Sequence, residues 1–370
     1  MTDRPAPKHI LIHDEIAAAI ASGEYAPGQQ LPTEKELVTA FNASRPTVVR
    51  AMQRLAAEGL IDRRAGSGTF VRRTASATTQ LFGLIIPGLG EKELMQAICS
   101  QMARAAQKSR HTLLWGDATD EPGSEIGSRA IELANRYVGM GVAGVFFAPV
   151  EFAPGKDAAN RTVVEICDQA GVPVVLIDRD IVAYPQRSRY DVVGIDNRRA
   201  MCTLVTHLIE QGEQRIEFVA RPLSAPTVAL RLAGYWDALR EATIEPMSYW
   251  VHYGEPDDRA FVQRILGAQR NRTFVCANDL TAARLMHTLE ELGVAIPKEV
   301  RVAGFDDVAY AHLLRVPLTS VRQPASAIGE AAIRAMFDRM VAGDLPGRDI
   351  FLPTSLVVRR SSARPRGRST

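Results

Sequence analysis

The 370-residue chain has no long apolar run, few cysteines and a formal net charge of only +2. No apolar segment approaches the roughly 18–20 residues that a membrane-spanning helix needs, so we expect no membrane partner. The opening MTDRPAPKHILIHDEI lacks the apolar core of a secretion signal, which predicts a cytoplasmic protein. The composition, 46% hydrophobic and 23% charged, is typical of a folded chain, and the length favours two or three domains.

Sites for metals, nucleotides or nucleophiles are also missing from the sequence. The four cysteines form no C-x-x-C pair, so we expect free buried thiols at Cys99, Cys167, Cys202 and Cys276. His9 and His13 have the i, i+4 spacing of a helical metal pair, but no acidic or cysteine partners follow, which favours a plain helix face. There is no G-x-x-x-x-G-K-[ST] and no G-x-S-x-G. We therefore expect no cofactor, no metal and no catalytic residue.

What is present begins with a helix over Lys8–Ser22 and a structured motif over residues 31–71. Thr33 and Glu36 form a T-x-x-E capping box, which predicts the start of a helix. Ser44 is positioned to cap a second helix, and Pro46 falls in its first turn, where the missing N–H costs nothing. The second helix carries an apolar stripe and leaves four polar side chains to point elsewhere, namely Arg45, Thr47, Arg50 and Arg54.

A basic hairpin follows: strand Leu60–Arg64, the turn AGSG, and strand Thr69–Arg73. Helix, turn, helix and hairpin in this order predict a winged helix-turn-helix, whose second helix fits the major groove of DNA. Each part alone has a simpler interpretation as a solvated arginine or an ordinary turn. The local charge favours DNA, because three acids (Glu36, Glu58, Asp62) stand against eight bases, Lys35, Arg45, Arg50, Arg54, Arg63, Arg64, Arg72 and Arg73.

From Leu81 onward short apolar strands alternate with helices. The strands are LFGLII, HTLLW, GVFFAP, PVVLID, VVGI, RIEFVA, Ser248–Val251, TFVCA, VRVAGF and LTSVRQ. The helices are Glu91–Gln107, Glu125–Val138, Ala158–Ala170, Arg198–Gln211, Thr227–Glu241, Asp279–Leu292 and Ala325–Val341. About ten strands with helices on both faces predict an α/β fold of two linked, doubly wound lobes. The expected domains are a winged helix-turn-helix (1–73), a linker (74–80), a two-lobed ligand-binding domain (81–362) and a basic tail (363–370).

Polar residues end several of these strands, where doubly wound folds bind ligands. They are Asp178-Arg179, Asn278-Asp279, Asp306-Asp307 and Arg322-Gln323, and Arg231 lies near the start of a helix. Charge-assisted hydrogen bonds from such a set suit a polyhydroxylated ligand. The alternative for any one of them is that it only caps the following helix.

The motifs LPTEKEL, SRPTVVRA, LAAEGLI and GSGTFV within residues 8–73 resemble the GntR family of bacterial winged-helix regulators. Residues 81–362 resemble the LacI-type effector domain, itself similar to periplasmic sugar-binding proteins. The motifs that carry this second resemblance are VPVVLIDRD, VVGIDNRRA, ALRLAGYWDAL, ANDLTA, RVAGFDDV, LTSVRQP and LPTSLVVRRSS. The combination resembles the arabinose-repressor branch of the GntR family. It implies a transcriptional regulator, expected to be a repressor, whose operator affinity a small carbohydrate controls.

The resemblance assigns DNA contacts to Lys35, Arg45, Thr47, Arg50 and Gly66. It assigns sugar hydrogen bonds to Asp178, Arg179, Arg231, Asn278, Asp306 and Gln323. Two departures stand out in the head: Val49 replaces the family's usual basic residue, and Ser67 replaces the one between the wing glycines. In the body, Pro87–Leu94 lacks the aromatic that relatives often have there, which leaves Trp115, Tyr253 and Phe305 as candidate stacking partners.

The leading hypothesis is therefore a homodimer that reads a palindromic operator with two heads and releases or binds it in response to a sugar. One alternative is a cytoplasmic sugar-binding receptor without a direct transcriptional role, which the DNA-binding head argues against. Another is a glycosidase or kinase that uses Asp306 and Asp307. Adjacent carboxyl groups usually point apart, whereas glycosidases need a defined carboxyl separation, so we expect no enzyme.

Overall fold

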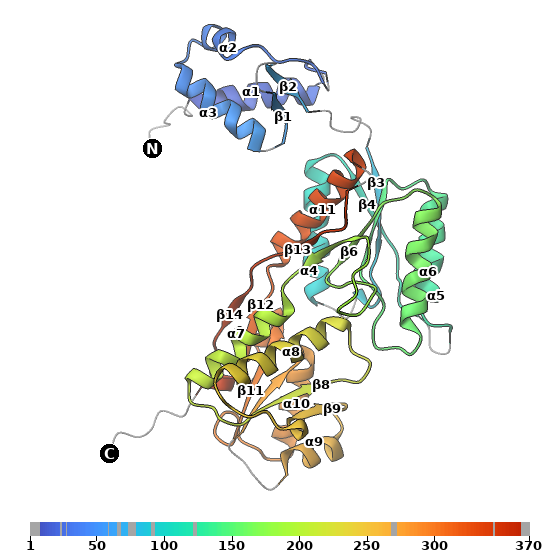
Figure 1. Cartoon of the computed structure of the whole chain (residues 1–370), viewed down its shortest axis with the longest axis vertical. Helices are drawn as coiled ribbons and strands as arrows, with labels where there is room; N and C mark the ends of the chain where they lie inside the picture. Colours follow the sequence, from blue (N-terminus) through green and yellow to red (C-terminus); the bar gives the residue numbers. More distant parts are fainter. Residues whose placement is uncertain are drawn as a thin grey trace. The chain divides into compact units, whose positions relative to one another are not determined.

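The computed structural model describes residues 8–22, 24–26, 28–57, 59–64, 68–72, 79–89, 93–120, 124–267, 272–342 and 345–363. The chain divides into two compact units, Met1–Thr78 and Thr79–Thr370 (Figure 1). The division falls inside the segment 74–80 that the sequence predicts as a linker. In the part of the chain that the structure describes, no helix is both long enough and apolar enough to cross a membrane.

The first unit is a winged helix-turn-helix. Its helices are α1 (Lys8–Ser22), α2 (Glu34–Ala40) and α3 (Arg45–Ala57). Its wing is the antiparallel pair β1 (Ile61–Arg64) and β2 (Gly68–Val71). The predicted order of elements is confirmed, and α1 has the predicted bounds.

Local hydrogen bonds explain where α2 begins. The amide of Glu36 donates to Thr33 Oγ1 at 3.3 Å, and the amide of Thr33 donates to Glu36 Oε2 at 2.7 Å, so the predicted capping box is present. The Ser44 hydroxyl lies 2.7 Å from that of Thr47. The apolar stripe of α3 is buried together with residues of α1, α2 and the wing, namely Val48, Met52, Leu55, Ile12, Ile16, Leu37, Ile61 and Val71.

The second unit contains two sheets, and the first forms the centre of lobe 1. Its order is β13-β7-β6-β5-β3-β4, and the six described strands are all parallel. They are β3 (Leu81–Ile85), β4 (Thr112–Trp115), β5 (Gly144–Phe147), β6 (Val174–Ile177), β7 (Asp191–Gly194) and β13 (Asp349–Phe351). Helices α5 (Ser128–Gly139) and α6 (Lys156–Gln169) pack together on one face. Helices α4 (Glu93–Lys108) and α11 (Ala325–Val341) cover the other (Figure 1).

The second sheet forms the centre of lobe 2, in the order β14-β12-β11-β10-β8-β9. The strands are β8 (Ile216–Ala220), β9 (Val251–Tyr253), β10 (Arg272–Cys276), β11 (Val300–Asp306), β12 (Thr319–Arg322) and β14 (Ser355–Val357). Among these described strands only β14 runs antiparallel to its neighbour. The helices of this lobe are α7 (Asn197–Glu210), α8 (Pro226–Glu241), α9 (Arg259–Leu266) and α10 (Asp279–Glu291).

Three short crossings join the lobes within the described residues. The chain leaves lobe 1 between β7 and α7, returns between β12 and α11, and crosses again between β13 and β14. Parallel strands direct their carboxyl ends to one edge of each sheet, so loops from both lobes meet there. The two-lobed, doubly wound prediction is confirmed.

Several sequence predictions need correction. Ser248–Trp250 is a 3₁₀ helix, and the predicted strand begins only at Val251. The sequence reasoning missed α9, β13 and β14, and its ten strands fall short of the twelve described here. Edge strands of three residues carry too few positions to show a hydrophobic period. The helix expected from Glu125 begins at Ser128 because Gly127 adopts a φ of 74°.

The cysteines are free thiols, as predicted, but only two of them are fully buried. Cys167 and Cys276 lie in the interior of their lobes, whereas Cys99 and Cys202 are half-buried on helices. On α1, buried His13 makes a 2.7 Å contact with the carboxylate of Asp14, through Nδ1. In the described residues no group of three His, Cys, Asp or Glu side chains could hold a metal ion.

Candidate nucleic-acid interface and ligand cavity

The expected base-reading face of α3 is accessible. Arg45 and Arg50 have exposed side chains, and Thr47 is half-buried beside Ser44. Lys35 is exposed on α2. Val49, which replaces a basic residue of the family pattern, is half-buried, so Arg50 is the next exposed cation along the helix. Exposed cations on a helix that is otherwise packed by its apolar side can reach phosphates and base edges.

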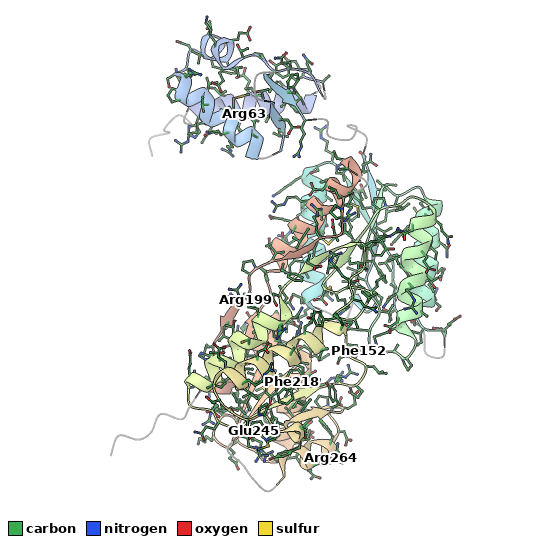
Figure 2. The ribbon with its side chains drawn as sticks, in the orientation of Figure 1. Arg63, Phe152, Arg199, Phe218, Glu245 and Arg264 are labelled. Atoms are coloured by element: carbon green, nitrogen blue, oxygen red, sulfur yellow. The ribbon has the colours of Figure 1, made fainter. Side chains whose placement is uncertain are left out.

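A single acid connects this helix with the wing, which the sequence reasoning missed. Glu34 of α2 accepts from Arg45 Nε at 3.5 Å and from Arg63 Nη2 at 3.2 Å (Arg63 is labelled in Figure 2). Such exposed pairs contribute little stability, about 0–1 kcal/mol each, but they orient both guanidinium groups. The predicted wing contact Gly66, and Ser67 beside it, lie outside the described residues.

A cavity of about 140 Å³ lies between the two lobes of the second unit. All six residues that the resemblance assigns to sugar binding line it: Asp178, Arg179, Arg231, Asn278, Asp306 and Gln323. They come from distant parts of the sequence. Asp178, Arg179 and Gln323 follow strands, Asp306 ends β11 and Asn278 caps α10, as the strand-end pattern predicts, whereas Arg231 lies in the second turn of α8. Their contacts differ from one another, however, and those contacts determine what each can offer a ligand.

Asp178 and Arg179 form a buried pair at the end of β6. Arg179 Nη1 donates to Asp178 Oδ2 at 3.0 Å and lies 3.2 Å from Glu151 Oε2. Its Nε donates to the carbonyl of Pro149 at 3.0 Å. The Arg179 guanidinium therefore orients two carboxylates toward the cavity, and two of its nitrogens donate to protein acceptors rather than to a ligand.

Arg231 projects from α8 into the centre of the site. Its Nε donates to Asn197 Oδ1 at 2.8 Å, its Nη1 donates to the carbonyl of Ala277 at 2.5 Å, and its Nη2 lies 3.6 Å from Asp306 Oδ1. The guanidinium carbon lies 3.8 Å from the centroid of the Phe305 ring. The ring and the acceptors hold the cation in one orientation.

Gln323 and Asp306 form the third group. Gln323 Nε2 donates to Asp306 Oδ1 at 2.8 Å, and Gln323 Oε1 is buried without a hydrogen-bond partner among the described residues. Burial, together with the nearby carboxyls of Asp279 and Asp178, raises the pKa of Asp306 to about 7 against the opposing charge of Arg231. The pair thus presents acceptors to whatever occupies the cavity.

The loop that carries Asp306 has an unusual backbone. Asp306 has a φ of 122° and Asp307 a φ of 52°, both in the region that favours glycine. Asp279 holds the loop, because its carboxylate accepts from Ser320 Oγ at 2.6 Å and from the amide of Val308 at 3.0 Å. Backbone strain of this kind persists where the surroundings over-determine it, often at binding sites. Sequence reasoning named Asp279 but missed this supporting role.

Asn278 fits both interpretations of a polar residue after a strand, as a cap of the following helix and as a ligand contact. It is the N-cap of α10, and its Oδ1 accepts from the amide of Thr281 at 2.8 Å. Its side chain also lines the cavity.

Two hydrogen bonds cross between the lobes beside the cavity. The amide of Phe152 in lobe 1 donates to the carbonyl of Leu223 at 3.0 Å, and the amide of Ala309 in lobe 2 donates to Glu93 Oε2 at 2.8 Å. The Arg221 guanidinium lies over the Phe152 ring at 4.8 Å from its centroid (Phe152 is labelled in Figure 2). These contacts depend on loops from two lobes, so no local sequence signal could have identified them.

The candidate stacking partners need correction. Trp115 is 68% exposed and Tyr253 is 53% exposed, and neither lines the cavity. Phe305 is buried beneath Arg231 rather than open to a ligand. The aromatic side chains among the described lining residues are Phe152 and Tyr310.

Comparison with known proteins agrees with both units. Residues 11–71 match the model for bacterial regulatory proteins of the gntR family, and residues 205–362 match the periplasmic binding protein-like domain. An arabinose metabolism transcriptional repressor of Geobacillus stearothermophilus is 26% identical over 98% of this chain and 99% of its own length. The HTH-type transcriptional regulator GalR of Escherichia coli K12 is 30% identical over 88% of this chain and 89% of its own.

Solved structures share the fold. The regulator CelR in complex with cellobiose is 24% identical with a TM-score of 0.66, over 86% of this chain and 91% of its own. The regulator CcpA of Lactococcus lactis is 21% identical with a TM-score of 0.65, over 77% of this chain and 99% of its own. The chain therefore belongs to the LacI/GalR family of transcriptional regulators, and its DNA-binding head is of the GntR type.

Proposed function

We propose that this regulator is a carbohydrate-controlled repressor that acts as a homodimer. Two heads read a palindromic operator, each with α3 in a major groove. The proposed contacts are Lys35, Arg45, Thr47, Arg50 and Gly66. The proposal rests on one observation above all: a cavity lined by six polar strand-end and helix residues belongs to the same chain as an α3 with exposed arginines.

The ligand residues in this proposal are Asp178, Arg179, Arg231, Asn278, Asp306 and Gln323. The names of the relatives support a carbohydrate, since one represses arabinose metabolism and another binds cellobiose. A ligand that contacts both lobes favours one arrangement of the lobes over others. It changes operator affinity only by its differential affinity for the two arrangements. Relief of repression is the expected sign.

The same proposal makes the protein a cytoplasmic binding protein rather than an enzyme. Asp306 and Asp307 could suggest acid–base chemistry, but their contacts diverge. Asp306 faces Gln323 and Arg231, whereas Asp307 pairs with Arg322 and Arg359 at 2.6 Å each. A sugar receptor without a transcriptional role is the second candidate, and the exposed arginines of α3 disfavour it.

The deciding experiment selects a duplex from a random pool with the purified full-length protein and then measures binding by fluorescence anisotropy. We expect a palindromic consensus sequence and release of the duplex by one sugar of a panel. The affinity should fall steeply between roughly 50 and 200 mM salt, as it does when a protein contacts several phosphates. Selection of no consensus would contradict the DNA-reading role. A consensus with no sugar response would contradict the effector role alone.

A further inference from the structure

The charge of the interlobe cavity points to the kind of ligand it can accept. Its described lining includes four carboxyl groups and three guanidinium groups, so the formal sum is 3 − 4 = −1 when all four carboxyls are ionised, that is above the pKa of about 7 of Asp306. The acids are Glu93, Glu151, Asp178 and Asp306, and the bases are Arg179, Arg221 and Arg231. An acid or phosphate ester would bring a further negative charge into a small space of about 140 Å³.

Protein acceptors already engage one or two nitrogens of each guanidinium group, which reduces what these groups can offer an anionic ligand. Arg179 serves Asp178, Glu151 and Pro149, as described above. Arg221 donates through Nε to Glu255 Oε2 at 2.8 Å, which adds a further carboxylate beside the cavity. To bind Arg179, an anionic ligand would have to draw it away from the buried carboxylate of Asp178, and leaving that carboxylate unpaired is costly.

Among the described lining residues, the one buried side-chain polar atom without a hydrogen-bond partner is an acceptor. Gln323 is 5% exposed, and since its Nε2 donates to Asp306, the partnerless buried atom is the carbonyl oxygen Oε1. A sugar hydroxyl can donate to such an oxygen, whereas an ionised carboxylate or phosphate dianion only accepts. Leaving a buried acceptor without a donor costs binding free energy, so a donor-rich ligand is favoured.

We infer that the cavity selects an uncharged, hydroxyl-rich carbohydrate and rejects the corresponding sugar acids and sugar phosphates. The inference rests on the proposed carbohydrate function and specifies its substrate class. The selection comes from the acceptor Gln323 Oε1 together with the excess of carboxyl groups over guanidinium groups in the lining, to which Glu93 contributes. The sign of the ligand's charge decides whether it binds. The cavity therefore accepts an amino sugar but rejects a sugar acid of nearly the same shape.

The test uses the full-length protein and matched series built on galactose and on glucose. Each series contains the parent hexose, its 2-amino derivative, its uronic acid and its 6-phosphate, and arabinose and xylose extend the neutral set. Calorimetry and thermal shift should show binding of at least one neutral sugar. In its series the amino sugar should bind within about tenfold of the parent, and the acid and the phosphate more weakly by a factor on the order of a hundred.

An acid or phosphate that binds as tightly as its neutral parent would overturn the inference and leave the proposed function standing. Failure of every carbohydrate to bind would overturn the proposed function itself, and this inference with it. The two failures are therefore distinguishable.

A charge variant sharpens the result. Glu93→Gln keeps an oxygen that can accept from the amide of Ala309 but removes one negative charge from the lining. This variant should reduce the ratio of the affinity for the neutral sugar to the affinity for its acid about tenfold. The control is Glu132→Gln, an exposed glutamate of α5 outside the cavity, which should leave the preference unchanged. An unaltered preference in Glu93→Gln, with an unaltered thermal melt, would refute the charge mechanism.

Discussion

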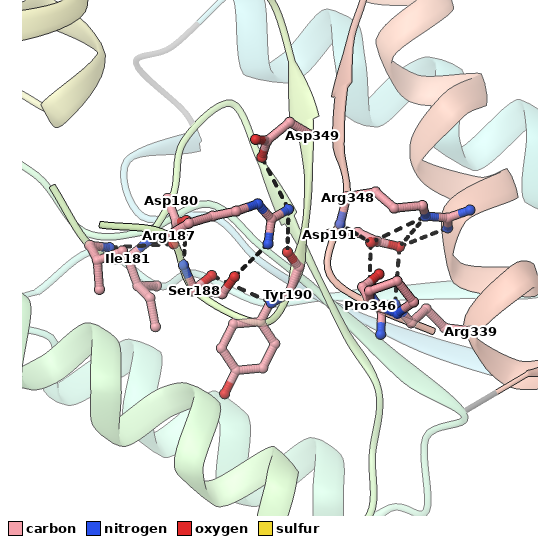
Figure 3. A network of polar contacts seen from close by, with 11 residues as sticks. Asp180, Ile181, Arg187, Ser188, Tyr190, Asp191, Arg339, Pro346, Arg348 and Asp349 are labelled. Carbon is pink, nitrogen blue, oxygen red and sulfur yellow. Dashed lines mark hydrogen bonds and ion pairs between the residues drawn. The ribbon is translucent and has the colours of Figure 1, made fainter. Parts of the chain in front are cut away.

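A buried aspartate at the start of β7 offers a quantitative test of what holds lobe 1 together. Asp191 is 0% exposed and accepts from Arg339 Nη2 at 2.7 Å and from Arg348 Nη2 at 2.8 Å (Figure 3). Arg339 belongs to α11, and Arg348 precedes β13. The carboxylate thus joins β7 to α11 and to the segment before β13, both of which belong to lobe 1.

The perturbation is Asp191→Asn, which keeps the shape and removes the charge. Burial alone would raise the pKa of Asp191, but hydrogen bonds from Arg339 and Arg348 outweigh it and lower the pKa from 3.8 to about 2. At about 1.36 kcal/mol per pH unit, this lowering corresponds to about 2.5 kcal/mol of stability at neutral pH. Loss of one partner of a buried pair typically costs about 3–5 kcal/mol. We therefore expect a loss of about 3 kcal/mol.

The sign with pH follows from the lowered pKa. The contribution of Asp191 is fully present above the unfolded pKa near 4 and is lost as the pH falls through about 2, where the wild-type carboxyl itself becomes protonated. Urea unfolding followed by tryptophan fluorescence at pH 7 and at pH 2.5 measures the difference between variant and wild type. That difference should shrink at the lower pH.

The matched control is Asp338→Asn. Asp338 pairs with the same Arg348 at 2.8 Å but is 48% exposed, so its removal should cost less than about 1 kcal/mol. If Asp191→Asn unfolds within about 0.5 kcal/mol of wild type at pH 7, or if its deficit is the same at both pH values, the reasoning is refuted.

Three further predictions concern the two proposed sites. Arg45→Ala should weaken operator binding by about 1–3 kcal/mol, and unchanged affinity in a gel-shift titration would reject α3 as the recognition helix. Arg231→Ala should leave operator binding intact but abolish the sugar response, and calorimetry that shows normal sugar affinity would contradict this. Sugar affinity should fall as the pH drops through about 7, because protonated Asp306 no longer accepts from a hydroxyl as an ion. Asp306→Asn should remove that pH dependence, and an unchanged dependence of sugar affinity on pH would show that a group other than Asp306 causes it.

The DNA-binding head was predictable because its signals are local. The capping box of Thr33 and Glu36 lies within one helical turn, and the buried stripe of α3 repeats at helical spacing. The same holds for α11, whose bounds Ala325–Val341 the sequence predicts correctly. The structure departs from the predicted elements at Ser248–Trp250, where a 3₁₀ helix of three residues is too short to show a hydrophobic period.

The six residues predicted for the ligand site do line the interlobe cavity, but the sequence did not indicate the electrostatics of that cavity. Polar residues after strands identify positions such as Asp178 and Asp306, since parallel strands end at a common edge. Nothing in the sequence indicates that Arg179 spends its donors on Glu151, or that Gln323 keeps a free carbonyl. These partners are set by loops that lie far apart in the sequence and meet at the ends of neighbouring strands.

The sequence by itself thus determined the order of most elements, the two kinds of unit and six of the polar residues that line the cavity. Hydrogen bonds between neighbours in the chain and the periods of helix and strand encode these features. Only the tertiary structure decided which charges pair, which acceptor stays open and how Glu93 and Phe152 bring the lobes together. Such pairings depend on distances between segments far apart in sequence, and a linear pattern does not record those distances.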